Sequence, residues 1–506
     1  MSSGVYWYPP LKPDAAVTIS PRLLVSPLRF DLPIKVIYAR HRIKNVHKIW
    51  AKSLYLKHIK IWNGFFEKDP PKRSPEDFLL AFEDVIRSIG EHGFQASKGV
   101  IPVSDDYTPI NGSHRIAAAI AWDKEVGCSL GAESPDYSYY RFLWRDRNGE
   151  FTQEEWDSVA SEYCRLRNDV SIALLFPVAV GKHREIQNYL RQAGAIVYEK
   201  SLDLDGESAV HLIRLIYQQE PWVGSTNDQF SGARGKAARC FARNGPVRFF
   251  LLQGNRKDKL VRVKGWVRDL FNAEKHSVHI TDSYQEVLRL SEALLNPNAL
   301  ARLRRIGSAP TPNHDLLISR LRQWIRKQDL DPEDICVTGG GVLSACSLRD
   351  CRDLDLFIGS TIAAATTLPV GLGNHESDQR YYPVSKEQIL YNPRFHFFLD
   401  GIKFASLDTV WKMKLNRREE KDLLDSELIA RSSMKLRNLL RKRFGTIFDF
   451  GLVGNSFAFG NRYVGALVSA ILFALVFGAL VYFGYGNVSM SVTTTPSATA
   501  PAQTQK

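Results

Sequence analysis

Apolar and polar positions alternate with two different periods along this chain, and the changes of period predict several domains. Apolar residues at helical spacing predict a helix that opens at Ser74 and runs through Ile89. Continuous apolar runs at 170–180 and 247–254 predict buried strands, each followed by an amphipathic helix and a further strand. Two such strand-helix-strand units between 165 and 295 predict an α+β sandwich of ferredoxin type.

The same reading predicts a multidomain chain that combines α/β and α+β domains. The segment before 130 reads as strand, turn, strand, sharp turn and helix, and the segment after 313 as a helix followed by alternating strands and helices. The expected order is a domain at 20–130, a second at 165–295, a third at 313–445, a transmembrane helix at 464–486 and a tail at 487–506.

The apolar run from Val464 to Gly486 contains no charged residue and has the length of a membrane span. Basic residues gather before it, at 435, 437, 441, 442, 443 and 462, whereas one Lys follows it, at the chain end. The positive-inside rule therefore predicts a single-pass protein whose N-terminal bulk is cytoplasmic, by default at a bacterial inner membrane. The Ser/Thr/Pro/Ala-rich tail is expected to be disordered.

Composition adds two restrictions. The 67 Lys and Arg residues outnumber the 54 Asp and Glu residues and give a net charge of +13, which suits anionic partners or an evenly solvated basic surface. The six cysteines form no CxxC pair, which argues against a zinc ribbon or a disulfide framework.

The strongest candidate for chemistry is a glycine turn followed by two alternate carboxylates. Gly339, Gly340 and Gly341 come directly after a predicted strand, and Asp353 and Asp355 share one face of the next strand. Two such carboxylates suit Mg²⁺, while glycines let backbone amides approach phosphates, so an NTP is the expected substrate or ligand. The alternative is that both carboxylates lie on a solvated strand edge.

This pattern resembles the nucleotidyltransferase superfamily, in which a glycine turn precedes a DxD strand. The resemblance implies that Asp353 and Asp355 are catalytic and bind the metal. The later segment GIKFASLDTVWKMKLNRREEKDLLD is similar to small bacterial members, and it places Lys403 on a GxKF strand before a K-D-x-x-D helix. Such enzymes have a third carboxylate, for which Asp400 is the nearest candidate, although Asp400-Gly401 is read in preference as a hairpin turn.

A second motif, Asn111-Gly112-Ser113-His114-Arg115, lies between a predicted strand and an Ala-rich helix. A glycine turn at a helix N-terminus is suited to phosphate, and the alternative is a capped helix with a surface Arg. With its flanking strands, the motif resembles the ParB/sulfiredoxin-like fold, which implies that these residues bind a nucleotide. Sulfiredoxin has a cysteine where Ser113 stands, which argues against sulfinic-acid repair.

A third motif, His279-Ile280-Thr281-Asp282-Ser283, is similar to the phosphorylated-histidine signature of nucleoside diphosphate kinases. The resemblance implies a catalytic His279 and a phosphate-contacting Arg268. The family's Lys-Pro-Asp strand end reads Phe176-Pro177-Val178 here, which removes its lysine. A structural or binding role for His279 is therefore favoured over catalysis.

These observations together predict a membrane-anchored, Mg²⁺-dependent enzyme that transfers a nucleotidyl or phosphoryl group to a small acceptor. By analogy with enzymes that activate head groups, its pathway would be surface glycan biosynthesis. One alternative is a nucleotide-binding scaffold or regulatory protein with degenerate sites. Another is a membrane-tethered nucleic-acid binder, against which stands the lack of a helix-turn-helix pattern after Arg115.

Overall fold

The structure is a computed structural model that describes residues 16–46, 48–68, 70–131, 149–204, 206–254, 257–307, 311–360, 362 and 367–444. Contacts divide the chain into a compact unit, Met1–Met434, and a second unit, Lys435–Lys506. The predicted span at 464–486 and the tail at 487–506 lie outside the described residues. Within the described ranges, no helix has the length and apolar character needed to cross a bilayer.

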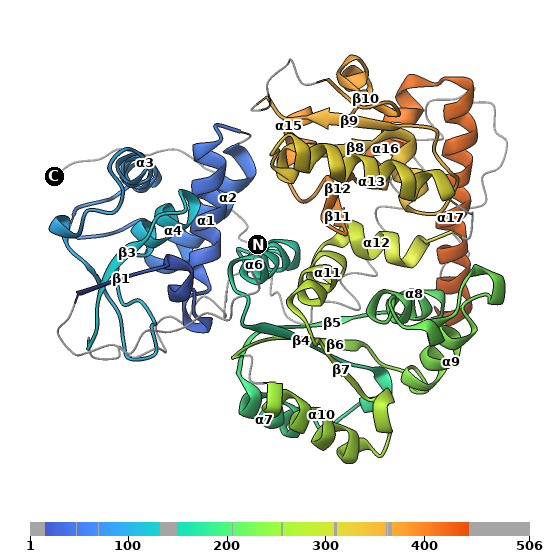
Figure 1. The fold of residues 1–506 in the computed structure, drawn as a ribbon, viewed down its shortest axis with the longest axis horizontal. Helices are drawn as coiled ribbons and strands as arrows, with labels where there is room; N and C mark the ends of the chain where they lie inside the picture. The colour runs from blue at the N-terminus through green and yellow to red at the C-terminus, as the bar shows by residue number, and fades with distance from the viewer. Residues whose placement is uncertain are drawn as a thin grey trace, which may run out of the picture. The chain divides into compact units, whose positions relative to one another are not determined.

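The fold is mixed α/β and contains several small sheets (Figure 1). The N-terminal sheet has the order β1-β3-β2, and β3 pairs antiparallel with β1 and parallel with β2. Its elements are β1 (Ala16–Ile19), α1 (Asp31–Ile43), α2 (Lys48–Asn63), α3 (Pro75–His92), β2 (Ile101–Pro102), α4 (Ser113–Ala121) and β3 (Val126–Ser129). The predicted helix start at Ser74 is confirmed, because Ser74 forms a capping box with Asp77.

The middle of the chain forms a four-stranded sheet in which every neighbouring pair is antiparallel, in the order β5-β6-β4-β7. Its elements are α6 (Gln153–Leu166), β4 (Val170–Leu175), α7 (His183–Ala193), β5 (Ala195–Leu202), α8 (Gly206–Ile216), α9 (Ser231–Cys240), β6 (Val247–Gln253), α10 (Lys257–Phe271), β7 (Val278–Ile280) and α11 (Tyr284–Leu294). Helices α7 and α10 cover one face, and α8 and α11 lie on the other (Figure 1). The two predicted strand-helix-strand units are thus present, with α8 and α9 inserted between them.

The last sheet has five strands in the order β10-β9-β8-β12-β11. Strand β8 is antiparallel to β9 and parallel to β12. The elements are α12 (Pro297–Arg305), α13 (Pro312–Lys327), β8 (Ile335–Thr338), α14 (Gly339–Ala345), β9 (Leu354–Ile358), β10 (Leu372–Asn374), α15 (Lys386–Tyr391), β11 (His396–Leu399), β12 (Ile402–Ala405), α16 (Leu407–Arg417) and α17 (Glu420–Phe444).

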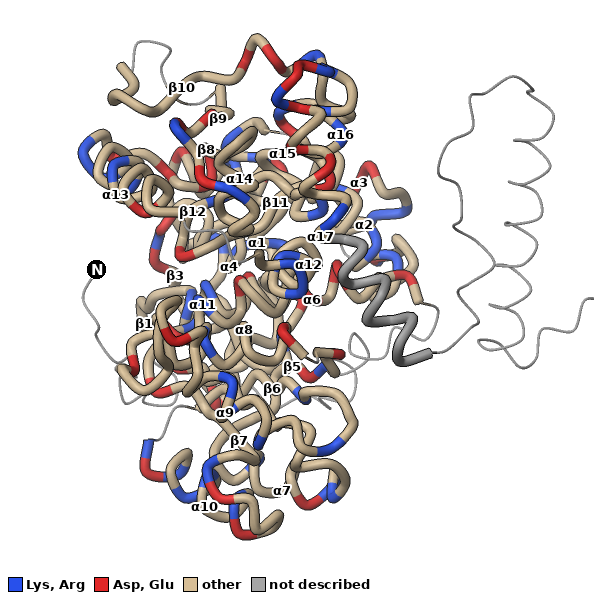
Figure 2. The backbone as a smooth tube through the Cα atoms, turned by 90° about the vertical axis from the view of Figure 1, so that its right-hand side faces the viewer, with Lys and Arg blue, Asp and Glu red and all other residues tan. Residues whose placement is uncertain are grey.

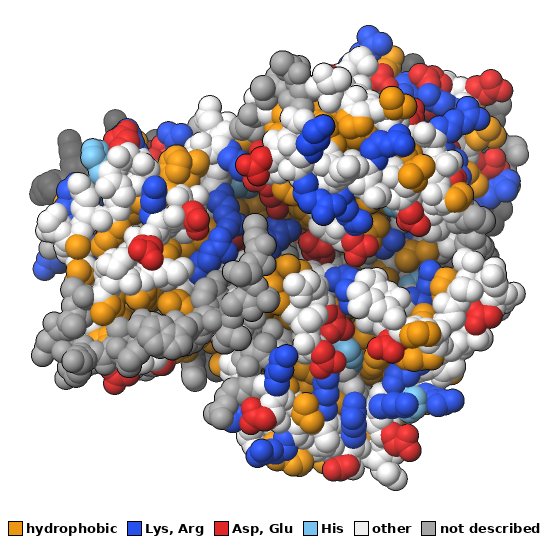
Figure 3. All heavy atoms as spheres, viewed as in Figure 1, with side chains coloured by type: hydrophobic (Ala, Val, Ile, Leu, Met, Phe, Trp, Pro, Cys, Tyr) orange, Lys and Arg blue, Asp and Glu red, His pale blue; other side chains and the backbone are white. Residues whose placement is uncertain are grey.

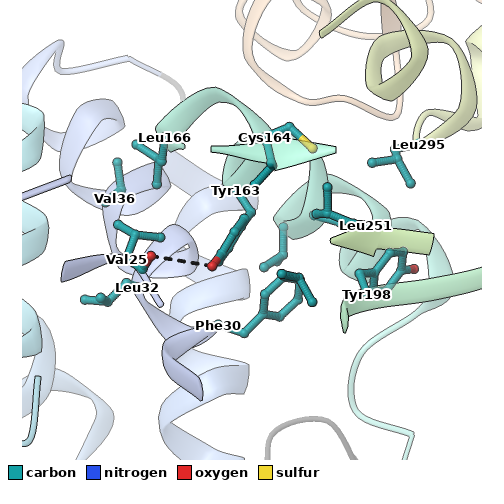
Figure 4. Close-up of a cluster of buried hydrophobic side chains, with 14 of the residues drawn as sticks. Val25, Phe30, Leu32, Val36, Tyr163, Cys164, Leu166, Tyr198, Leu251 and Leu295 are labelled. Carbon is teal, nitrogen blue, oxygen red and sulfur yellow. Dashed lines mark hydrogen bonds between the residues drawn. The ribbon is translucent and has the colours of Figure 1, made fainter. Parts of the chain in front are cut away.

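One hydrophobic core joins the N-terminal helices to the middle sheet (Figure 4). The ring of Phe30 lies 6.1 Å from the rings of both Trp156 and Tyr198, and the Tyr163 hydroxyl donates to the Val25 carbonyl at 3.5 Å. Helix α6 contacts both α1 and α11. A second core includes the buried side chains of the five-stranded sheet, and a third lies between the middle sheet and helices α7 and α10. The segments 20–130 and 165–295 therefore share buried apolar surface, which favours their folding together.

Candidate functional site

The glycine turn after β8 and the start of β9 form one edge of the five-stranded sheet. Thr338, at the end of β8, pairs across the antiparallel ladder with Asp355. Gly339 follows with a φ of 55°, a left-handed conformation that glycine adopts without steric cost. A Cβ at Gly339 would overlap the Asp355 carboxylate, so the glycine makes room for that carboxylate against the backbone.

The other two glycines have different surroundings. A Cβ at Gly341 would lie 2.6 Å from Val337 and 2.8 Å from Leu354, so this glycine permits close packing of α14 on the sheet. A Cβ at Gly340 would meet only the Arg349 guanidinium, at 3.3 Å. Gly340 is therefore the glycine at which the backbone borders a basic side chain.

The two carboxylates lie where the alternation of β9 predicts. Asp353 is exposed and Asp355 half-buried, whereas the alternate residues Leu354 and Leu356 are fully buried. Burial raises the pKa of the Asp355 carboxyl, the nearby His375 opposes this shift, and Asp353 adds to it. Among the described residues, no Lys or Arg forms an ion pair with either carboxylate, so a cation bound there would relieve their repulsion.

His375, which the sequence motifs did not indicate, lies between two carboxylates. Its Nδ1 is 3.7 Å from Asp355 Oδ1, and its Nε2 is 3.7 Å from Asp378 Oδ2. Burial lowers the pKa of His375, which is only 5% exposed, although both carboxylates oppose that shift. His375 and Asp378 therefore extend the acidic edge beyond the two residues of the DxD pattern.

A network of buried ion pairs fixes basic side chains beside this edge. Lys414 Nζ lies 2.8 Å from both Asp422 Oδ1 and Asp425 Oδ2, and Asp425 also accepts two hydrogen bonds from the Arg349 guanidinium, at 2.5 and 2.8 Å. Arg417 binds Asp422 at 2.8 Å. Burial alone would raise the pKa of Asp422, but Arg417 and Lys414 outweigh it and hold the pKa at about 2.

The two aspartates of the K-D-x-x-D segment thus hold cations in place, whereas Lys421 is exposed and pairs with Glu419 at 3.0 Å. Arg417 also reaches Asp378, at 2.6 Å, and so connects the network to the acidic edge. Figure 2 shows the resulting mixture of acidic and basic residues along the segment that contains α16. Lys414 and Arg417 are three residues apart on α16, a spacing that could have indicated their shared direction.

Asp400 and Lys403 lie away from the glycine turn. Asp400, with a φ of 49°, occupies the turn between β11 and β12, at the start of β12. Since β12 is parallel to β8, this turn lies at the end of the sheet opposite to Gly339. Lys403 is 1% exposed, and its Nζ pairs with Glu333 at 2.8 Å and donates to the Leu390 carbonyl at 2.6 Å. The structure therefore does not bring the predicted phosphate ligand Lys403 to the turn.

The motif at 111–115 forms the predicted sharp turn and helix start. Gly112 has a φ of 79° and precedes α4. Arg115 folds back to donate to the Gly99 carbonyl at 2.6 Å. His114 lies 2.9 Å from the Tyr55 hydroxyl, and burial holds its pKa well below the usual range. Neutral His114 therefore bonds to a residue of the protein interior, and Asn111 is the exposed residue of the motif.

Asn111 contributes to the same turn, since its side-chain oxygen accepts from the Gly112 amide at 2.6 Å. The motif therefore keeps the backbone geometry of an anion site, while its two basic side chains have protein partners.

His279 lies on β7 and is 7% exposed. Its Nε2 is 2.8 Å from Glu286 Oε1, and its ring packs edge-on against Tyr217 at 5.3 Å. Burial raises the pKa of the Tyr217 hydroxyl, and Arg268 is close enough to oppose that shift. Glu286 also accepts from the Asp282 amide at 2.9 Å, so the motif joins β7 to the start of α11.

The three motifs belong to three different sheets. Among the described residues, no group of three or more His, Cys, Asp or Glu side chains has the arrangement of a metal site. A Mg²⁺ ion bound with a nucleotide usually takes one or two carboxylates and completes its shell with water and phosphate oxygens, which Asp353 and Asp355 fit. Comparisons of the chain with protein-family models, curated proteins and solved structures find no match.

Proposed function

We propose that this protein is a membrane-anchored nucleotidyl- or phosphoryl-transfer enzyme whose reaction takes place at the Gly339–Asp355 edge. The observation that carries the proposal is the placement of a half-buried carboxylate against a left-handed glycine at the end of β8. Asp353 and Asp355 would hold Mg²⁺, which would neutralise charge on a nucleotide's phosphates. The proposal includes a nucleotidyltransferase-like domain at 313–445, which is preceded by a ferredoxin-type domain and a ParB/sulfiredoxin-like domain.

The residues of the chain itself have separable roles in this proposal. The Gly339 turn lets the substrate's phosphates approach the backbone, and Arg349 lies beside Gly340 on the same turn. Asp422 and Asp425 are positioning residues, because they hold Lys414, Arg417 and Arg349 in fixed orientations.

The N-terminal and middle domains are proposed as nucleotide-binding parts of the same enzyme. The helix-start turn at 111–115 supports a phosphate contact through backbone amides. His279 is held by Glu286 and packed against Tyr217, which supports a binding or structural role. Incorporation of labelled phosphate from NTP into the protein, lost in His279→Ala, would instead assign phosphotransfer to the middle domain.

The deciding experiment measures Mg²⁺-dependent release of pyrophosphate or phosphate from a panel of NTPs. Asp355→Asn and Asp353→Asn should lower the rate at least about a hundredfold, as expected when charge stabilisation at the reacting phosphate is lost. The control is Asp408→Asn, an exposed carboxylate of α16 that pairs with Lys412. Equal rates in the wild type and both site variants would refute the proposal. NTP binding without turnover, abolished by Asp355→Asn, would identify a nucleotide-binding scaffold.

A further inference from the structure

A cavity of about 550 Å³ lies away from the Gly339 turn. Its walls come from α8, α12 and α13, from the C-terminal end of α14 and from the turn between β11 and β12. This turn is at the sheet end opposite to Asp355, so the cavity is separate from the proposed reaction site. Its volume is in the range of cavities that hold small metabolites.

Three arginines, one from each of the three helices, line this cavity. Arg302 on α12 donates to the Ala345 carbonyl at 2.8 Å, and Arg322 on α13 donates to the Asp400 carbonyl at 3.0 Å. Arg214 on α8 lies over the Phe230 ring at 3.6 Å. Within the described part of the chain none of the three forms an ion pair with a carboxylate, in contrast to Arg349 and Arg417 in the first site.

The arginines affect one another electrostatically. Burial lowers the pKa of Arg214, and the neighbouring Arg302 and Arg234 lower it further, while Glu207 opposes the shift. Burial also lowers the pKa of Arg302, and Cys346 and Asp400 oppose this shift. Guanidinium groups nevertheless stay protonated at neutral pH, so a bound anion would offset their partial burial and mutual repulsion.

The rest of the lining suits an anion with hydrogen-bonding groups. His314 is 8% exposed, and its Nδ1 has no hydrogen-bond partner among the described residues. His211 Nδ1 is 2.8 Å from the Leu303 carbonyl. The two carboxylates of the lining, Asp315 and Asp400, belong to residues that are exposed at its rim. Figure 3 shows Lys and Arg side chains gathered on the face over α13.

We propose that this cavity binds a phosphorylated small molecule, whose phosphate is held by Arg214, Arg302 and Arg322. Guanidinium forks match the tetrahedral oxygens of phosphate with pairs of parallel hydrogen bonds, and a dianion compensates several of them at once. Because α8 belongs to the middle sheet's domain and α13 to the last domain, the bound phosphate would bridge the two. The site is additional to the proposed reaction site and does not depend on it.

The test uses the full-length Asp353→Asn/Asp355→Asn protein in the presence of EDTA, so that nucleotide binding with Mg²⁺ at the first site does not contribute. Calorimetric titration with inorganic pyrophosphate, glucose 6-phosphate and metal-free ATP separates a free phosphate, a sugar phosphate and a nucleotide as the source of the phosphate group. At least one of these probes is expected to bind with a dissociation constant below about 1 mM.

Arg322 and Arg326 lie on the same helix, α13, and provide a matched pair of variants. Arg322→Gln and Arg214→Gln should each weaken binding at least about tenfold, the usual effect of losing a hydrogen bond to a charged group. Arg326→Gln, also on α13 but outside the cavity lining, should bind as tightly as the parent. Thermal unfolding of each variant checks that the fold is retained. Failure of all three probes to bind would overturn the proposal, as would equal weakening by Arg326→Gln.

Discussion

Replacement of Gly339 by Ala tests the geometry on which the proposed reaction site depends. The φ of 55° costs a residue with a Cβ about 1 to 2 kcal/mol. The added Cβ would also overlap the Asp355 carboxylate, so this side chain must leave its rotamer, at a further cost of about 1 kcal/mol. Gly339→Ala is therefore expected to lower the free energy of unfolding by about 2 to 3 kcal/mol.

Gly340→Ala is the matched control, one position further along the chain. Gly340 lies inside α14, and its Cβ would approach only the end of the Arg349 side chain. Replacing a helical Gly by Ala usually stabilises a protein by about 0.5 to 1 kcal/mol, so Gly340→Ala should be neutral or slightly stabilising.

Urea unfolding measures both changes, and pyrophosphate release measures the effect of Gly339→Ala on the site. The displaced Asp355 carboxylate should abolish Mg²⁺-dependent release even at temperatures where the variant is folded. If Gly339→Ala and Gly340→Ala have the same free energy of unfolding, the left-handed conformation does not require a glycine at position 339. Full activity in Gly339→Ala would show that the position of Asp355 does not matter.

Two further predictions concern buried charge. Lys414→Met leaves Asp422 and Asp425 buried without their shared cation and should cost about 3 kcal/mol in urea unfolding, whereas Lys412→Met, which removes an exposed pair on the same helix, should cost less than about 1 kcal/mol. Burial raises the pKa of Glu292 from 4.5 to about 7, so the folded state binds a proton that the unfolded state releases, and wild-type stability should fall as pH rises from 4.5 to 7. The change in stability amounts to about 1 to 2 kcal/mol after allowance for the partial exposure of the side chain. Glu292→Gln should remove this pH dependence. If the variant and the wild type have the same pH profile of unfolding, the assignment to Glu292 is wrong.

Secondary structure was the part most accessible from the sequence. Local patterns predict the strands β4 and β6, which are long apolar runs, and the capped helix α3. The shared core of the first two domains depends on contacts such as that between Val25 and Tyr163, which are 138 positions apart. No local pattern encodes such a pair, so the sequence alone does not show that one core includes residues of both segments.

The positions of the candidate site residues likewise follow from the sequence only where they depend on a local pattern. Asp353 and Asp355 follow from strand alternation next to a glycine turn, a local pattern. His375 directly follows β10, a strand of three residues that pairs with β9 although a long connection separates the two strands in the sequence. No local pattern predicts this pairing. Lys403 carries the right charge for a phosphate ligand, but its environment is set by Glu333 and Leu390, which approach from elsewhere in the fold.

Strand direction explains which further carboxylate can assist the DxD pair. Since β8 and β12 are parallel and β9 runs against them, the ends of β8 and β12 and the start of β9 meet at the edge proposed as the reaction site. Asp400 precedes β12 and is therefore at the wrong end, while Ser406, which follows β12, caps α16 through its hydroxyl at 3.1 Å from the Thr409 amide. Asp378 lies near this edge, because His375 stands between Asp378 and Asp355 and Arg417 holds the Asp378 carboxylate. The 3.7 Å separations on both sides of the imidazole are longer than hydrogen bonds, so Asp355 and Asp378 act on His375 through their charge.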